Sequence, residues 1–195
     1  MAFPSTSINY TSVAVKGSRV YASYAGLQQG ITVRDLDLNQ LSYFNTGINA
    51  NGIAAGPNDD VYIAAGNHIY HYGTNGNLIR DMAFPSSSIN YTDVSVLCDT
   101  VYASYNGSQQ GFTVRDLELN QRSYVAISAD ISSIAAGPNA DAHFRQSHLQ
   151  LQSRWRFNSG HGFSCRQHRI LWRVCNLSYP HLSRLLKALA WAMSI

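Results

Sequence analysis

The sequence predicts an all-β fold built from repeated four-stranded units, on three observations. Residues 1–60 match residues 82–141 at 38 of 60 positions without a gap, so the chain contains a duplicated unit. That unit divides again, because residues 8–15 align with residues 48–55. Each half consists of short runs rich in Val, Ile, Tyr and Thr, separated by Gly, Pro, Asn and Asp, which is the composition of strands and turns. A period of about 40 residues with four strands is typical of β-propeller blades, so we expect a partial β-propeller of about 3.5 blades.

The expected strands follow one another along each blade. They lie at residues 12–15, 19–24, 31–36 and 40–46 in blade one, at 52–55, 61–65, 68–72 and 78–84 in blade two, and at 93–96, 100–105, 112–117 and 121–127 in blade three. A fourth blade begins at Ser133 with the Ile-Ala-Ala-Gly-Pro-Asn sequence that also begins blade two. The predicted blades therefore cover residues 1–47, 48–88, 89–128 and a truncated 129–141, within one repeat domain at 1–141.

The segment from Gly52 to Ala64 reads Gly-Ile-Ala-Ala-Gly-Pro-Asn-Asp-Asp-Val-Tyr-Ile-Ala and resembles the repeats of NHL-type and YVTN-type β-propellers. The resemblance covers residues 1–141 and implies blade architecture. It implies no activity, because propellers host unrelated functions. The Trp-Asp dipeptide of the commonest propeller class is absent from the sequence.

The composition changes abruptly after residue 141. Residues 1–141 hold 6 Lys and Arg and all 11 Asp and Glu, a net charge of −5, whereas residues 142–195 hold 8 Lys and Arg and no acid, a net charge of +8. A shift of the reading frame by one base restores the repeat in two places. The codons allowed for residues 147–151 can then spell His-Ile-Tyr-Asn-Tyr, which matches residues 68–72 at all but one position. The codons allowed for residues 157–164 can spell Leu-Ile-Arg-Asp-Met-Ala-Phe-Pro, which is the sequence of residues 78–85. We therefore interpret 142–195 as a basic, poorly ordered tail produced by a frameshift, and we expect it to be dispensable.

This interpretation weakens the motifs of the tail. Cys165, His168 and Cys175 imitate a metal cluster but do not supply four ligands at a defined spacing. The Arg-rich tail with its three Trp imitates a nucleic-acid-binding segment, yet we expect no nucleic-acid partner, no metal and no cofactor.

No run approaches the roughly 18 apolar residues of a membrane helix, and the N-terminus lacks a signal-peptide pattern. We expect no membrane partner and a cytoplasmic location by default, with an extracellular one still open for a longer array.

Two groups of residues in the repeat suggest catalysis or metal binding. The close acidic pairs Asp35 with Asp37 and Asp116 with Glu118 are of the kind that hydrolases or calcium sites use. They stand where the third strand turns into the fourth, however, and an Asp there more often binds the turn backbone. His68 and His71 lie on opposite faces of a strand and cannot easily share a metal. Streptogramin lyases are propellers of similar appearance that use a histidine and metal ions, but blades one and three lack matching histidines.

Two recurring polar groups indicate a ligand site. One follows the fourth strand of a blade and the other joins its second and third strands, and in propellers these connections open on the same face. The candidate ligand residues are Asn9, Tyr10, Gln28 and Gln29, with a second copy at Asn90, Tyr91, Gln109 and Gln110. Neutral hydrogen-bonding groups beside an aromatic ring suit a glycan or a peptide.

We therefore predict a non-catalytic binding or interaction scaffold, lectin-like in one form, and not an enzyme. A propeller enzyme of the lyase or hydrolase kind, and a non-functional fragment of a longer frameshifted gene, are the alternatives. Ordinary loop residues copied by a recent duplication would also explain the recurring groups. Because each blade buries its faces only against its neighbours, we further expect self-association through the open blade faces.

Overall fold

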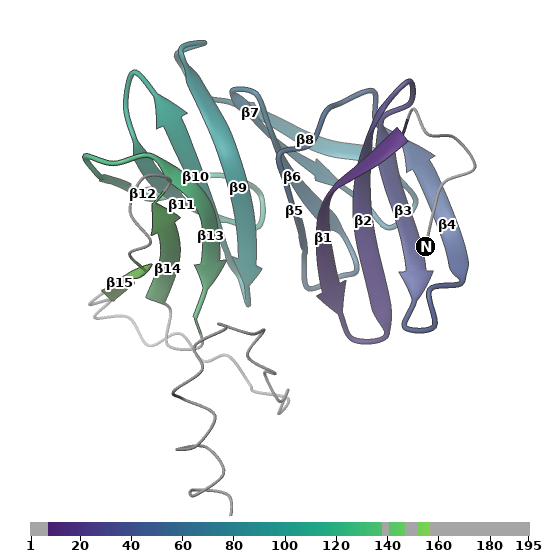
Figure 1. Ribbon diagram of the computed structural model, residues 1–195. Helices are drawn as coiled ribbons and strands as arrows, with labels where there is room; N and C mark the ends of the chain where they lie inside the picture. The colour runs from purple at the N-terminus through teal and green to yellow at the C-terminus, as the bar shows by residue number, and fades with distance from the viewer. Residues whose placement is uncertain (1–7, 138–140, 147–151, 157–195) are drawn as a thin grey trace, which may run out of the picture. The chain divides into compact units, whose positions relative to one another are not determined.

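The computed structural model describes residues 8–137, 141–146 and 152–156, and all regular structure within them is β-strand (Figure 1). Blades one and two contain β1 (Ile8–Lys16), β2 (Arg19–Gly26), β3 (Gly30–Asp35), β4 (Gln40–Asn45), β5 (Gly52–Ala55), β6 (Val61–Ala65), β7 (His68–Tyr72) and β8 (Leu78–Ala83). Blades three and four contain β9 (Ile89–Leu97), β10 (Thr100–Gly107), β11 (Gly111–Asp116), β12 (Gln121–Ala126), β13 (Ile131–Ala136), β14 (Asp141–Gln146) and β15 (Gln152–Arg156).

The strands form four antiparallel sheets in chain order, β1 to β4, β5 to β8, β9 to β12 and β13 to β15. Each sheet is a meander, because every strand pairs with the next strand along the chain. The first strands of successive sheets lie against one another, β5 contacting β1 and β9, and β9 contacting β13 (Figure 1). This is the arrangement of propeller blades, so the predicted partial β-propeller is confirmed.

The predicted strands agree with the observed ones to within two residues at each end, except at the start of β1 and β9. Each begins four residues earlier than expected, at Ile8 and Ile89. A β-bulge allows the extension, because the register shifts around Thr11 in blade one and around Thr92 in blade three. Both threonine hydroxyls lie 2.8 Å from a serine hydroxyl of the neighbouring strand, which gives the bulged residue a partner.

The predicted end of the blades at residue 141 is too early. β14 pairs with β13 and β15 pairs with β14, so the fourth sheet continues into the segment that we expected to be a tail. Ala142 and Phe144 are 0% and 4% exposed and belong to the core between blades three and four. Apolar residues two apart are sufficient to anchor a strand on one face, whatever the origin of the sequence. The rest of the predicted tail lies outside the described residues.

The core consists of three layers, one between each pair of neighbouring blades. The largest fully buried side chains are all in these layers: Tyr21 between blades one and two, Tyr62, Tyr91 and Tyr105 between blades two and three, and Phe112 between blades three and four. Stability therefore depends on contacts between blades, since a single sheet has no core of its own. None of the described residues forms a helix long and apolar enough to cross a membrane.

Candidate functional site

The two polar groups that the sequence singled out lie at the same end of blade three. Asn90 on β9 pairs with Asn106, the next-to-last residue of β10, and Gln109 and Gln110 lie in the loop that follows. Asn90 and Gln109 are exposed, and Gln110 is half-buried. The carbonyl of Gln110 accepts the Ile127 N–H at 2.9 Å, which fixes this loop to the segment leaving β12.

Blade one repeats this geometry. Asn9 pairs with Ala25, and the loop carrying Gln28 and Gln29 follows β2. Asn9 and Gln28 are exposed, and the carbonyl of Gln29 accepts the Thr46 N–H at 2.9 Å. The main-chain frame of the candidate site is thus present twice in the chain.

A chain of serine hydroxyls joins the two loops of blade three. The Ser86 and Ser88 hydroxyl oxygens are 2.7 Å apart, and those of Ser88 and Ser108 are 2.8 Å apart. The Ser108 N–H also donates to the Ser88 carbonyl at 3.2 Å, so the contact does not depend on side chains alone. We define the loop site of blade three by its six polar residues: Ser86, Ser88, Asn90, Ser108, Gln109 and Gln110.

Ser108 is a site residue that the sequence analysis missed. Blade one has Leu27 at the same place, and Leu27 is 83% exposed. A serine that replaces a leucine between two otherwise matching loops was a visible signal.

The prediction that Tyr91 presents its ring to a ligand is wrong. Tyr91 is 0% exposed, and it packs edge-on against Phe84 and Tyr105 with ring centroids 5.9 Å and 6.3 Å away. Its hydroxyl accepts a hydrogen bond from Arg115 at 3.1 Å. Blade two covers this side chain, so Tyr91 stabilises the contact between blades. Tyr10, its copy in blade one, is only half-buried.

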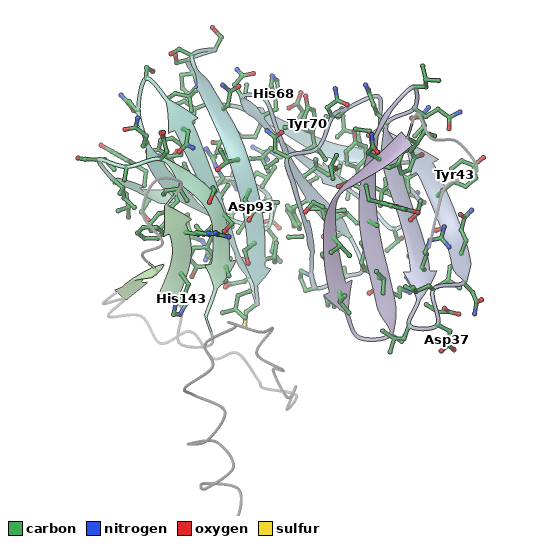
Figure 2. All side chains as sticks on the ribbon, in the orientation of Figure 1. Asp37, Tyr43, His68, Tyr70, Asp93 and His143 are labelled. Atoms are coloured by element: carbon green, nitrogen blue, oxygen red, sulfur yellow. The ribbon has the colours of Figure 1, made fainter. Side chains whose placement is uncertain are left out.

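The exposed ring of blade three belongs to a different tyrosine. Tyr124 on β12 is 65% exposed and pairs with Thr113 across the sheet. Burial raises the pKa of Tyr105, and the neighbouring Tyr91 and Tyr124 raise it further. Tyr105 pairs with Gly111, the residue after Gln110. Tyr124 therefore offers an accessible ring near the loop site of blade three, and Tyr43 holds the matching place in blade one (Figure 2).

The first member of each acidic pair, Asp35 or Asp116, holds a turn together. Asp35 accepts hydrogen bonds from the Asn39 main chain at 2.8 Å and from its side-chain amide at 2.9 Å, and Asp116 binds Asn120 in the same way. The side-chain hydrogen bond from Asn39 is the largest of the effects that lower the pKa of Asp35. The turn role expected for these aspartates is confirmed. The described residues contain no group of three or more His, Cys, Asp or Glu arranged to hold a metal ion.

A buried polar cluster connects blade two to blade three. His71 Nε2 lies 2.7 Å from Asp60 Oδ2, and the His71 ring stacks on Tyr62 with centroids 4.3 Å apart. The Tyr62 hydroxyl donates to the Leu117 carbonyl of blade three at 2.9 Å. Burial raises the pKa of Tyr62, so its hydroxyl remains protonated and can donate. His71 Nδ1 is buried and has no hydrogen-bond partner.

The second histidine of the strand points the other way, as its spacing predicts. His68 Nδ1 lies 2.6 Å from Asp81 Oδ1, and the ring of His68 stacks on Tyr70 with centroids 5.3 Å apart (Figure 2). Both partners of this pair are partly exposed. His68 and His71 therefore have separate carboxylate partners on opposite faces of β7, and they cannot bind one metal together.

Asp93, which Figure 2 labels on β9, links the first strands of blades three and four and lies close to Gly52 of blade two. Its carboxylate accepts the Val94 N–H at 2.9 Å and the Ile134 N–H of blade four at 3.0 Å. Gly52 of blade two leaves space for it, since a Cβ at Gly52 would lie 2.3 Å from Asp93 Oδ1. Burial raises the pKa of Asp93 to about 6, and the two backbone hydrogen bonds oppose that rise. The geometry is that of a structural tie between blades.

No family model and no curated protein matches the sequence. The chain is similar in structure to a protein of unknown function from Bacteroides caccae, with a TM-score of 0.55, 10% identity, and coverage of 67% of this chain and 51% of that one. It is also similar to the computationally designed Ika4 protein, with a TM-score of 0.60, 12% identity, and coverage of 80% and 95%.

A third similar structure is a glutaminyl cyclase from Myxococcus xanthus, with a TM-score of 0.54, 12% identity, and coverage of 73% of this chain and 63% of the cyclase. The chain thus spans about half of the Bacteroides caccae protein and less than two thirds of the cyclase. Similarity at such low identity concerns the fold alone. Together with the four meander sheets, it identifies the chain as a β-propeller array.

Proposed function

We propose that the chain is a non-catalytic binding scaffold and that the loop site of blade three recognises a neutral polar ligand, with a glycan as the leading class. The observation that carries the proposal is the hydroxyl chain of Ser86, Ser88 and Ser108, which links two loops that are far apart in sequence. Serine hydroxyls and the amides of Asn90 and Gln109 both donate and accept hydrogen bonds, as sugar hydroxyls require.

The charge of the site supports a neutral ligand. None of the six residues that define the site is ionisable. The exposed Tyr124 nearby supplies an apolar face on which a sugar ring can stack. A peptide scaffold is the other form of the same proposal, because amide and hydroxyl groups also bind an extended main chain.

A glycan array probed with the full chain tests the proposal, followed by variants against any glycan that binds. Ser108→Leu introduces the residue that blade one carries at this place, so the loop has a precedent for it. We expect Ser108→Leu and Gln109→Ala each to weaken binding by about tenfold or more, the range for residues that dominate an interface. Gln28→Ala in blade one is the matched control and should change little. Binding that survives both blade-three variants, or the absence of any glycan binding, would contradict the glycan proposal.

An enzyme is the second candidate, and the exposed pair of His68 and Asp81 favours it. A carboxylate that orients one nitrogen of a histidine leaves the other nitrogen for proton transfer. One structure with this fold is a glutaminyl cyclase, so a peptide with an N-terminal glutamine is the first substrate to test. Ammonia release that disappears in His68→Ala and persists in Gln28→Ala would support this candidate.

A chain that neither binds a glycan or peptide nor turns over a substrate would match the third interpretation, a non-functional fragment of a frameshifted gene.

A further inference from the structure

Asn106 joins the loop site of blade three to blade four. Its Oδ1 accepts the Ile131 N–H at 2.8 Å, and its Nδ2 donates to the Ile131 carbonyl at 3.0 Å. One amide thus holds both main-chain polar groups of the first residue of β13. Asn106 also pairs with Asn90 and stands two residues before Ser108, so its backbone belongs to the frame of the loop site. We call the two hydrogen bonds to Ile131 the Asn106 clamp.

Ile131 is central to the contact between blades three and four. It is 0% exposed and packs in the core that these two blades share. Its carbonyl also accepts the hydroxyl of Thr92, the bulged residue of β9, at 2.9 Å. Since β9 and the end of β10 position the loop site, a shift of Ile131 reaches the site through two strands.

The loop at 107–110 has little freedom to absorb such a shift. Gly107 has a φ of 132°, and a Cβ there would overlap the Ser88 carbonyl oxygen, which accepts the Ser108 N–H at 3.2 Å. The side-chain amide of Gln110 donates back to the Gly107 carbonyl at 3.4 Å. The loop therefore moves with Asn106 as a unit.

Blade one carries the same loop without the clamp. Residues 24–30 and 105–111 differ at only two positions, where blade one has Ala25 and Leu27 and blade three has Asn106 and Ser108. Ser108 completes the hydroxyl chain of the loop site, and Asn106 forms the clamp. The methyl group of Ala25 cannot hydrogen-bond the next blade. Both differences thus concern the proposed ligand site, one directly and the other through its link to blade four.

The described part of blade four is held less firmly than the other blades. Its sheet has three described strands, whereas each of the other three sheets has four. Besides Asn106 and Thr92, blade three holds β13 through Asp93, which accepts the Ile134 N–H, and through Ser95, whose hydroxyl accepts the Ala136 N–H at 3.0 Å. These are single side-chain contacts, and units with few contacts open locally most often.

We propose that the docking of blade four sets the geometry of the loop site in blade three through the Asn106 clamp, and thereby regulates the affinity of that site. When β13 is docked, the clamp holds the loop at 107–110 in its binding arrangement. When blade four opens, the loop is released and binding weakens. Coupling between two sites is reciprocal, so an occupied loop site holds blade four docked. The regulation rests on the proposed ligand site, whereas the geometric coupling does not.

Amide hydrogen exchange of the full chain tests the coupling without any glycan. The reporter is the Ser108 N–H, which donates to the Ser88 carbonyl. Asn106→Ala removes the clamp, and Phe144→Ala loosens blade four at a residue that is 4% exposed in the shared core. We expect each to speed exchange at Ser108 by about fivefold or more. Ile53→Ala, at an equally buried position between blades one and two, is the control and should leave the rate near that of the wild type.

A double variant shows whether the clamp carries the effect. In the Asn106→Ala background, Phe144→Ala should add little further exchange at Ser108, because the connection is already broken. Ser95→Ala removes one hydrogen bond to β13 and copies Ala14 of blade one, so it is the milder replacement if Phe144→Ala does not fold. Unchanged exchange at Ser108 in Asn106→Ala, or additive effects in the double variant, would overturn the proposal.

Binding measurements separate this inference from the proposed function. With the tightest-binding glycan of the array, Asn106→Ala should weaken binding by about fivefold or more, although its side chain faces blade four. Faster exchange at Ser108 with an unchanged glycan affinity would overturn the regulation and leave the ligand site standing. An array without any binder would contradict the proposed function and its regulation, while the exchange rates would still decide the coupling.

Discussion

Single side chains in this protein act mainly by linking one blade to the next. Asp93 is the clearest example, since one carboxylate oxygen binds its own strand and the other binds the first strand of blade four. Tyr62 is a second example, since its hydroxyl donates to the Leu117 carbonyl of blade three while its ring stacks on His71, the partner of Asp60. Blades one and three have Val33 and Val114 at the position of His71.

The raised pKa of Asp93 makes stability depend on pH. Its pKa is about 6 in the folded chain against an ordinary value of 3.8, so the folded state binds the proton more tightly than the unfolded state. Ionised Asp93 therefore disfavours the folded state above pH 6, and this cost disappears as the pH falls toward 4. The effect is on the order of 2–3 kcal/mol.

We expect the free energy of unfolding of the wild type to rise relative to that of Asp93→Asn between pH 7 and pH 4. Urea denaturation of both proteins across this range measures it. If the free energies of unfolding of the two proteins change equally with pH, the pKa of Asp93 in the folded chain is not raised.

The buried contact between His71 and Asp60 in blade two predicts that a double variant is more stable than a single one. His71→Val alone leaves the Asp60 carboxylate buried without its histidine, which should lower the free energy of unfolding by about 3 kcal/mol. The double variant Asp60→Thr with His71→Val copies Thr100 and Val114 of blade three and should recover most of that loss. Chemical denaturation at neutral pH measures both. A double variant no more stable than His71→Val would mean that the loss of the His71 partner of Asp60 is not the source of the effect.

At the scale of a strand and its turn, the same residue contributes differently to stability in the two copies of the repeat, because its burial differs. Leu38 and Leu119 occupy the same place in the turn between the third and fourth strands, with φ angles of 67° and 63°. A leucine in this left-handed conformation costs about 1 kcal/mol or more. The full burial of Leu119 offsets this cost, whereas Leu38 is 42% exposed and gains less from burial.

Substitution by glycine should therefore have opposite effects at the two positions. Leu38→Gly removes backbone strain with little loss of buried surface and should stabilise the monomer by about 0.5–1 kcal/mol. Leu119→Gly loses a fully buried side chain and should destabilise by about 2–4 kcal/mol. Thermal unfolding at low protein concentration compares them. Equal effects of the same sign would contradict this account.

The strands could be predicted from sequence because their signal is local. Alternating residues, turn residues and a duplicated pattern defined nearly every strand, and the turn role of Asp35 followed from its place. The burial of Tyr91 could not be predicted in this way, because the residues that cover it belong to the preceding blade. The contact between Ser88 and Ser108 was missed for a similar reason: it forms only when two loops of one sheet come together.

At the scale of the whole chain, the position of the last stable blade determines which truncations are tolerated. A chain ending after Asp141 loses β14 and β15 and uncovers Phe112 and Ile134 of the core between blades three and four. We expect it to melt at a lower temperature than a chain ending after Gly160, which retains both strands. Differential scanning calorimetry of the two truncated chains measures this. Identical melting temperatures for the two truncated chains would support the predicted end of the repeat domain at residue 141.

The closeness of Gly52 to Asp93 has a consequence for blade four. A Cβ at Gly52 would lie 2.3 Å from Asp93 Oδ1, so any larger residue at Gly52 must displace this carboxylate. The same carboxylate accepts the Ile134 N–H of blade four. A substitution in blade two therefore disturbs the contact between blades three and four as well as its own.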